Sequence, residues 1–341
     1  MSGGTLLRAG PIRLPVPYRP VRIVSPPAAA PFPRIGGVIE IPAELAATQS
    51  RYNGAAGRAF VAALPDLAAR WLERWGLRPD GPSMYGMCAL VLPVVREADG
   101  RPAALKLQAV DEETAGEPVA LREWAAAGAG AVELLDHDPE SGALLLERLD
   151  ERRPLSGEAD VRKAVEVLGT VLARLTAVPA PEGLRTLGGV VERMLAVAPE
   201  RTALLGDPAD RRLLADCAAA VGEVADEPGD RLLHWDLHYD NILAGRADTG
   251  RAGEWIALDP KPLAGDPGFE LFPALDNLFD ADEVVWRFDA LTEALGLEHD
   301  RERARAWTLG RVLQNGLWGA GSGEVRVAAD HAEIARRLLG R

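Results

Sequence analysis

The sequence predicts an α+β fold of two lobes, in which a small antiparallel sheet precedes a mostly helical part. Between residues 84 and 150, short apolar runs and turn signals alternate in the order β-β-α-β-β. Further along, apolar residues recur at helical spacing almost to the end of the chain, interrupted only by a loop-and-strand segment at residues 231–262. The predicted parts are a flexible arm at residues 1–37, an N-lobe at residues 38–150 and a C-lobe at residues 151–341.

In the N-lobe, each element follows from a local signal. The Ala-rich stretch 44–76 carries apolar residues three or four apart, which predicts a helix that ends at Gly76. Asp99-Gly100 is a hairpin signal between two β-like runs, Ala89–Val95 and Ala103–Val110. The remaining predicted elements are a helix at about 112–128 and two strands, Ala131–Leu135 and Ala143–Leu149.

In the C-lobe, helices dominate after a hinge that we place at Glu-Arg-Arg-Pro, residues 151–154. Proline and adjacent charged residues interrupt the preceding strand pattern there. The predicted helices are at about 157–178, 181–198, 208–226, 266–280, 283–296, 300–318 and 325–339.

Bulk composition restricts the class of protein. Hydrophobic residues make up 48% and charged residues 26% of the chain, which is typical of a globular enzyme. The net charge of −13 argues against a nucleic-acid partner and favours a cationic small molecule. The chain has 2 cysteines and no apolar run of membrane-spanning length. We therefore expect a cytoplasmic protein without a membrane partner, as a monomer or weak homodimer.

One polar loop carries most of the chemical information. Residues 234–241 read His-Trp-Asp-Leu-His-Tyr-Asp-Asn. Phosphoryl transfer from ATP needs a carboxylate that deprotonates the attacking hydroxyl and oxygen ligands that hold Mg²⁺ on the phosphates. Asp236 fits the first role, and Asn241 and Asp259 fit the second, with the base-to-Asn spacing of a kinase catalytic loop. We assign His234 to the catalytic set as the residue that orients this loop.

Two other interpretations of this loop remain. Asp and Asn are common loop residues, so the match alone is weak, and its support comes from the apolar segments on both sides. His234, His238 and an acid could bind zinc, but their spacing matches no closed zinc motif. A sheet lobe followed by a helical lobe that carries these acids predicts a bilobal, protein-kinase-like architecture.

The nucleotide side is predicted from Lys106, one of three lysines in the chain. It lies mid-strand in Ala-Ala-Leu-Lys-Leu, where a buried ammonium is costly unless it is paired. We expect it to contact the nucleotide phosphates and to pair with Glu117, with Glu123 and Glu113 as alternatives. The contrary interpretation is an edge-strand lysine that points to solvent. Ser83, in a loop with one glycine, either contacts the phosphates or belongs to a plain turn.

The acceptor side is predicted from residues after Asp259. Lys261 either neutralises the transferred phosphoryl group or pairs with Asp266, which is itself well placed as a helix N-cap. Glu270 begins an acidic stretch that forms either an anionic wall for a cationic substrate or a solvated face. Trp307 and two other tryptophans at helical spacing are expected in the core.

These residues resemble those of the aminoglycoside phosphotransferase family, in the branch of streptomycin 6-phosphotransferases and hydroxyurea phosphotransferases. The similarity covers roughly residues 38–340 and is greatest in the Asp-Pro-Lys-Pro run. The matching segments are Ala104-Leu-Lys-Leu107, Glu117 with Ala120-Leu121 and Trp124, Gly142-Ala-Leu-Leu-Leu-Glu-Arg-Leu-Asp150, Leu233-His234, Asp236-Leu237-His238, Ala257-Leu-Asp-Pro-Lys-Pro262 and Gly265-Asp-Pro267.

The resemblance implies an ATP- and Mg²⁺-dependent O-phosphotransferase with a protein-kinase-like fold, acting on an aminoglycoside-like acceptor. It implies that Glu147 and Leu149 belong to the segment that holds the adenine. Trp235 stands where the family usually has glycine, so it either packs inward or narrows the acceptor pocket, and we include it with Glu270 and Asp266 as a candidate substrate residue. The alternatives are a kinase for hydroxyurea or another hydroxylated metabolite, and a pseudokinase-like binding module.

Overall fold

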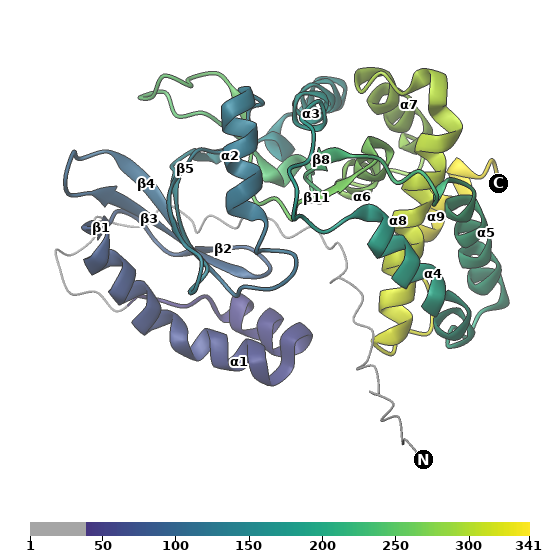
Figure 1. Ribbon diagram of the computed structural model, residues 1–341, viewed down its shortest axis with the longest axis horizontal. Coiled ribbons are helices and arrows are strands. Elements are labelled where there is room, and N and C mark those ends of the chain that lie inside the picture. Colours follow the sequence, from purple (N-terminus) through teal and green to yellow (C-terminus); the bar gives the residue numbers. More distant parts are fainter. Residues whose placement is uncertain (1–38) are drawn as a thin grey trace, which may run out of the picture.

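The structure is a computed structural model that describes residues 39–341. A sheet lobe, coloured purple and blue, lies beside a helical lobe, coloured green and yellow (Figure 1). The expected α+β, protein-kinase-like fold class is therefore confirmed, whereas the predicted arm lies outside the described residues. No helix in the described range is long and apolar enough to cross a membrane.

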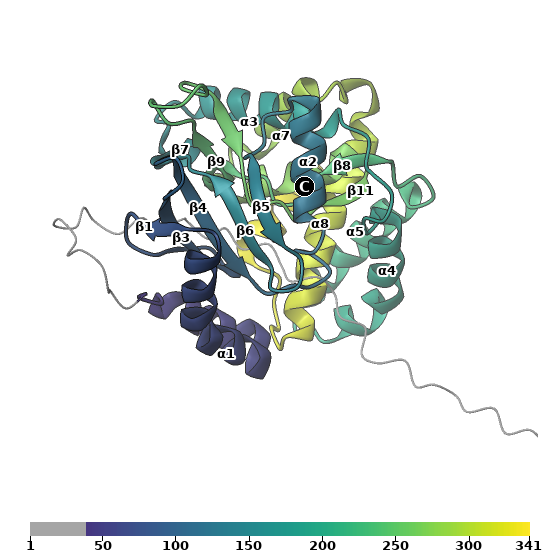
Figure 2. The same cartoon turned by 60° about the vertical axis from the view of Figure 1, so that its left-hand side comes forward.

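The N-lobe sheet is antiparallel, with strand order β1-β3-β4-β6-β5 and β2 paired to β3. Helix α1 lies against its outer face, as Figure 2 shows beside β1 and β3, and α2 connects β4 to β5. The elements of this lobe are α1 (Ala43–Arg74), β1 (Leu77–Pro79), β2 (Met84–Tyr85), β3 (Ala89–Arg96), β4 (Pro102–Gln108), α2 (Glu117–Ala127), β5 (Leu134–Asp138) and β6 (Ala143–Glu147).

The alternation of side chains along β4 places Lys106. Leu105 and Leu107 are fully buried in the cluster that α1 covers with Leu64 and Trp71. Successive residues of a strand point to opposite faces, so Lys106 lies on the other face of the sheet, toward the C-lobe. The predicted hairpin is present, and its register pairs Lys106 with Val91.

Several N-lobe boundaries differ from the prediction for physical reasons. Helix α1 is kinked at Gly54, whose φ of 55° and ψ of −127° are not helical. The helix expected from residue 112 begins at Glu117, because residues 111–116 form a turn held by the Asp111 carboxylate. The strand expected from Ala131 begins at Leu134, and Ala131 instead forms an isolated bridge to Ala257. Strands β1 and β2 were not predicted, since they have only 3 and 2 residues.

The C-lobe is helical around two small sheets, β10-β9-β7 and β11-β8. The expected hinge at residues 151–154 is part of strand β7 rather than a free linker. The elements of this lobe are β7 (Asp150–Pro154), α3 (Val161–Thr176), α4 (Leu187–Ala203), α5 (Pro208–Val224), β8 (Arg231–Leu233), η2 (Tyr239–Asn241), β9 (Ile242–Ala244), β10 (Trp255–Ala257), β11 (Leu263–Gly265), η3 (Pro267–Glu270), α6 (Leu271–Asp276), α7 (Val284–Ala294), α8 (Arg301–Gly321) and α9 (Ala329–Leu338).

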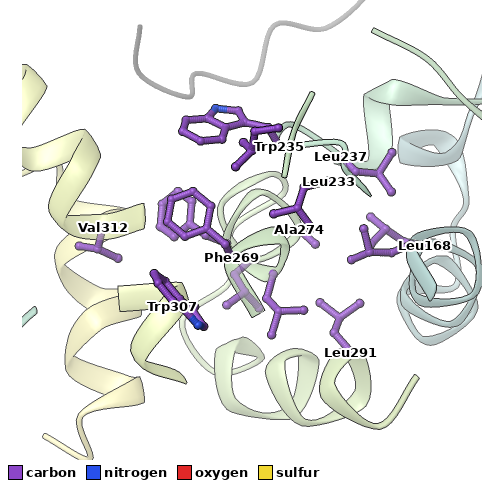
Figure 3. Packing of buried hydrophobic residues seen from close by; sticks show 14 of the residues in the cluster. Leu168, Leu233, Trp235, Leu237, Phe269, Ala274, Leu291, Trp307 and Val312 are labelled. Carbon is purple, nitrogen blue, oxygen red and sulfur yellow. The ribbon is translucent and has the colours of Figure 1, made fainter. Parts of the chain in front are cut away.

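The core of the C-lobe forms around α8, which is buried along most of its length. Trp307 is fully buried there, as expected, with its ring 6.2 Å from that of Phe269. Figure 3 shows Trp235 in the same group, above Phe269 and beside Leu233. The single helix expected at 266–280 is divided into η3 and α6, and Asn277 leaves the helical conformation with a ψ of 128°. A rigid core therefore lies directly beneath the polar loop at residues 234–241.

Candidate active site

The hairpin β9–β10 brings two predicted metal ligands together. Its register pairs Ile242 with Ala257, and the Leu258 amide continues the ladder by donating to the Asn241 carbonyl oxygen at 3.0 Å. Asn241 directly precedes β9, and Asp259 lies two residues after β10. Residues 18 positions apart in the chain are thus held at one end of the hairpin by backbone pairing.

The predicted base lies between β8 and η2. The Asn241 side-chain amide donates to the Asp236 carbonyl oxygen at 2.9 Å, which closes the loop on itself. The His234 ring contacts the Leu258 carbonyl oxygen through Nε2 at 3.1 Å and thereby joins the loop to the segment of Asp259. Burial lowers the pKa of His234 to about 4, so this ring is neutral at physiological pH. Its contacts support the predicted orienting role.

The Asp236 carboxylate has one paired and one free oxygen. Oδ2 accepts from the Lys261 ammonium at 2.7 Å, and Oδ1 is buried with no hydrogen-bond partner among residues 39–341. Burial is the largest single effect and opposes the charged form, but Lys261, His238 and Arg311 together outweigh it and lower the pKa of Asp236 below its ordinary value. The result is an ionised carboxylate with an unused acceptor. Lys261 therefore pairs with Asp236 rather than with Asp266, and its contact with the transferred phosphoryl group stays a prediction.

Lys106 is paired rather than exposed. Its ammonium lies 2.7 Å from Glu117 Oε1 and 2.5 Å from Asp259 Oδ1, and Gln108 donates to Glu117 Oε2 at 2.6 Å. Among the three candidate partners, Glu117 is therefore the one that the fold brings to Lys106. Burial disfavours the charged form of Asp259, but Lys106 and Lys261 outweigh it and lower the pKa of Asp259 to about 2.

The donors at Asn241 and Asp259 fit a hard cation. Asn241 uses its amide nitrogen toward Asp236, which leaves the amide oxygen for a ligand, and Asp259 is ionised. No group of three or more His, Cys, Asp or Glu residues in the described range has the geometry of a metal site. A cation held here would take its other ligands from phosphates and water, which is the usual coordination of protein-bound Mg²⁺.

A single pocket of about 1370 Å³, including its open mouth, joins these groups. Its wall combines apolar and polar side chains and includes Glu147 and Leu149 from the segment between the lobes. The apolar side chains include Val91, Ala104, Val132, Leu146, Leu243 and Leu258, and the polar ones include Lys106, Glu113, Asp236, His238, Asn241, Asp259 and Lys261. A ligand with an apolar ring and an anionic tail fits this combination.

Six predicted site residues lie outside this lining. Two of them, His234 and Glu117, contact the lining residues Leu258 and Lys106. The other four are Trp235, Glu270, Asp266 and Ser83. Trp235 is 1% exposed and packs inward, and Glu270 is fully buried below it. Asp266 caps η3 through the Gly268 amide at 2.8 Å, the structural role expected for it, and also pairs with Arg303. Ser83 lies just before the lining residues of β2. Direct substrate or nucleotide contact stays a prediction for these four.

Several residues that complete the site have no local signal in the sequence. Asn53 of α1 lines the pocket, and its neighbour Gln49 donates to the Met87 carbonyl oxygen at 3.1 Å. Arg185 donates to the Lys261 carbonyl oxygen at 2.6 Å. Helical spacing shows that a residue lies on a helix, but it does not show which distant loop the helix meets, so these contacts were not predictable.

The sequence comparisons agree with this geometry. A family model described as aminoglycoside/hydroxyurea antibiotic resistance kinase matches residues 74–323. The chain belongs to this family. It is 62% identical over 310 residues to a hydroxyurea phosphotransferase of Kitasatospora aureofaciens, covering 90% of this chain and 88% of that protein. It is 50% identical over 311 residues to a streptomycin 6-kinase of Streptomyces glaucescens, covering 89% of this chain and 98% of that protein.

Solved structures support the fold. An aminoglycoside phosphotransferase in ternary complex with AMP-PNP and hygromycin B has a TM-score of 0.57 at 15% identity, covering 81% of this chain and 98% of that one. A choline/ethanolamine kinase family protein from Mesorhizobium loti has a TM-score of 0.53 at 20% identity, covering 75% and 84%. The chain is a small-molecule O-phosphotransferase with a protein-kinase-like fold.

Proposed function

We propose that this kinase transfers the γ-phosphoryl group of ATP, with Mg²⁺, to a hydroxyl group of a cationic, aminoglycoside-like compound. The observation that carries the proposal is the free Oδ1 of Asp236. It belongs to an ionised carboxylate in a pocket whose wall also carries Lys106 and Asp259. A general base needs an unused oxygen of this kind to receive the hydroxyl proton.

The rest of the site supports the nucleotide. The apolar side chains of the pocket wall suit an adenine ring, and Glu147 and Leu149 belong to the same wall. Lys106, held by Glu117, suits the phosphates. Asn241 and Asp259 would hold Mg²⁺, which would neutralise charge on the phosphate oxygens.

Lys261 has a second role in the proposed reaction. Its ammonium is already 2.7 Å from the base, and its backbone amide donates to the His234 carbonyl oxygen at 3.0 Å. A hydroxyl that donates to Asp236 Oδ1 would therefore lie close to a fixed positive charge. Such preorganised charge stabilises the transferred phosphoryl group as the transition state forms.

Hydroxyurea is the second candidate acceptor, because the relative at 62% identity is named as a hydroxyurea phosphotransferase. The relatives named as streptomycin 6-kinases are 50% and 48% identical. The two candidates differ in charge, since aminoglycosides are cationic and hydroxyurea is neutral. The net charge of −13 favours the cationic acceptor.

The test is acceptor-dependent ADP release from ATP across streptomycin, other aminoglycosides, hydroxyurea and simple amino sugars, with and without Mg²⁺. We expect release with a streptomycin-type acceptor and Mg²⁺, and a phosphomonoester in the product by ³¹P NMR. Release with hydroxyurea alone would assign the second acceptor. Nucleotide binding without turnover on any compound would contradict both assignments and identify a binding module.

A further inference from the structure

Arg185 lies between α3 and α4 and contacts two parts of the active site at once. Its Nη2 donates to the Lys261 carbonyl oxygen at 2.6 Å, and its Nε donates to the Pro262 carbonyl oxygen at 3.2 Å. Its guanidinium carbon lies 4.4 Å from the centroid of the Trp235 ring. One side chain therefore touches the residue before Asp236 and the residue whose ammonium pairs with Asp236.

The contact with Trp235 matters because the backbone there is unfavourable. Trp235 has a φ of 71°, a region in which a bulky residue is an outlier unless the surroundings hold it. Its amide donates to Glu270 Oε1 at 2.6 Å, and its ring lies 4.5 Å from the Arg311 guanidinium carbon and 5.2 Å from the Phe269 ring. Because Trp235 directly precedes Asp236, the packing of this ring affects the position of the Asp236 backbone.

The contact with Lys261 matters because Lys261 lies in no helix or strand. The Lys261 ammonium reaches Asp236 only if the backbone of residues 261–262 stays in place. Arg185 occupies two successive carbonyl oxygens of that backbone with a planar, charged donor, which fixes direction as well as distance. The Arg185 carbonyl oxygen also accepts from the Ala264 amide at 2.9 Å.

A third contact extends from Arg185 to the other lobe. Glu113, in the turn before α2, places Oε1 3.8 Å from Arg185 Nη1, and both side chains are about nine-tenths buried. A Cβ added at Gly116 in the same turn would lie 2.9 Å from Leu184 and 3.0 Å from Pro262, so the turn packs closely on this segment. Arg185 is thus enclosed by both lobes.

We propose that Arg185 is a positioning residue that holds Lys261 and Trp235 in the arrangement that presents Asp236 to the acceptor. The proposal rests on the assignment of Asp236 as the base. It acts through other residues, because Arg185 itself is absent from the pocket lining.

The test is steady-state kinetics of Arg185→Gln, with Arg211→Gln as the matched control. Arg211 also donates to two successive carbonyl oxygens, those of Leu205 and Gly206, and it does not line the pocket. We expect Arg185→Gln to lower kcat about 10- to 100-fold, the effect of a small misplacement of reacting groups, while KM for ATP stays within about 3-fold. Arg211→Gln should match it in loss of melting temperature and keep the wild-type kcat.

Arg185→Lys retains the charge without the planar fork, so its kcat should lie between those of the wild type and Arg185→Gln. This variant also serves if Arg185→Gln does not fold. A wild-type kcat in both Arg185 variants, or an equal loss of kcat in Arg211→Gln, would overturn the proposal.

A crystal structure of the Arg185 variant separates this proposal from the function of Asp236. If Asp236→Asn retained turnover, the assignment of Asp236 as the base would fail. The effect of Arg185 on the position of Lys261 relative to Asp236 could still be measured. Separation of Lys261 Nζ from Asp236 Oδ2, now 2.7 Å apart, would support positioning by Arg185. An unchanged contact would overturn it.

Discussion

Two lysines that line the pocket each pair with a carboxylate, and the two pairs are built differently. Lys106 lies on strand β4, and its main partner Glu117 begins helix α2. Lys261 and Asp236 both lie outside regular structure. The first pair is held by sheet pairing and by the apolar cluster on the far face of β4, whereas the second depends on hydrogen bonds to backbone carbonyl groups and on the packing of Trp235.

This difference in construction suits the two pairs to different functions. The pair of Lys106 and Glu117, which we call the rigid pair, is suited to hold phosphates, which do not move far during transfer. The pair of Lys261 and Asp236, which we call the loop pair, is suited to bind the hydroxyl group and accept its proton. The comparison also shows which substitutions should affect only the transfer rate and which should affect only nucleotide binding. Changes at the loop pair should affect the rate of transfer, and changes at Asp259, the proposed metal ligand beside Lys106, should affect nucleotide binding.

The largest expected effect is at Asp236, the proposed general base and a member of the loop pair. Asp236→Asn removes the proton acceptor, so turnover should fall about 10²- to 10⁴-fold. ATP affinity, measured by calorimetry, should stay within a few-fold because the Lys106 pair is intact. Turnover at the wild-type rate would remove Asp236 from the role of base and with it the contrast between the two pairs.

A large effect on binding is expected beside the rigid pair. Asp259→Ala removes an ionised carboxylate whose pKa is about 2 and which contacts Lys106 at 2.5 Å. We expect Mg²⁺ to lose its enhancement of nucleotide binding in a titration at fixed ADP. Asp248→Ala, an exposed aspartate after β9, is the control. A normal Mg²⁺ dependence in Asp259→Ala would refute the ligand role.

A pH effect distinguishes Lys261 from the other lysines. Because its cation lowers the pKa of Asp236, Lys261→Met should raise that pKa and move the acid limb of kcat/KM about 1–3 units to higher pH. Lys163→Met is the control, since Lys163 is exposed and pairs with Glu158 on the surface. An acid limb that coincides in the two variants would show that Lys261 does not set the protonation of the base.

The smallest expected effect is on stability, beneath the loop pair. Burial raises the pKa of Glu270 from 4.5 to about 7, against the opposing Trp235 amide and Arg311. Between these values the folded state holds a proton that the unfolded state has lost, so the free energy of unfolding should fall as pH rises through this window. Over the whole window, the free energy of unfolding should fall by about 3 kcal/mol because of this one carboxyl group.

Glu270→Gln should remove that dependence, because it keeps an acceptor for Trp235 and does not titrate. Urea unfolding at pH 4.5, 6 and 8 measures it, with the exposed Glu140→Gln as control. A slope in Glu270→Gln equal to that of the control would mean that Glu270 does not titrate in this range.

The sequence by itself determined the order of the main elements and the fold class, and it made Glu117 the first of three candidate partners for Lys106. Each depends on information close in the chain: hairpin and helix periodicity, a costly lysine within an apolar strand, and a carboxylate 11 residues later. The His-Trp-Asp loop and Asp259 were recognisable for the same reason, since catalysis requires those residue types at short spacing.

Only the tertiary structure decided which partners meet across long separations. Lys261 pairs with Asp236 rather than Asp266, Arg185 reaches backbone 76 residues away, and Trp235 turns into the core. None of these contacts leaves a periodic or local signature, because each depends on the packing of loops against separate helices. The strained conformation of Trp235 in particular is stable only where Arg185, Arg311 and Glu270 surround it.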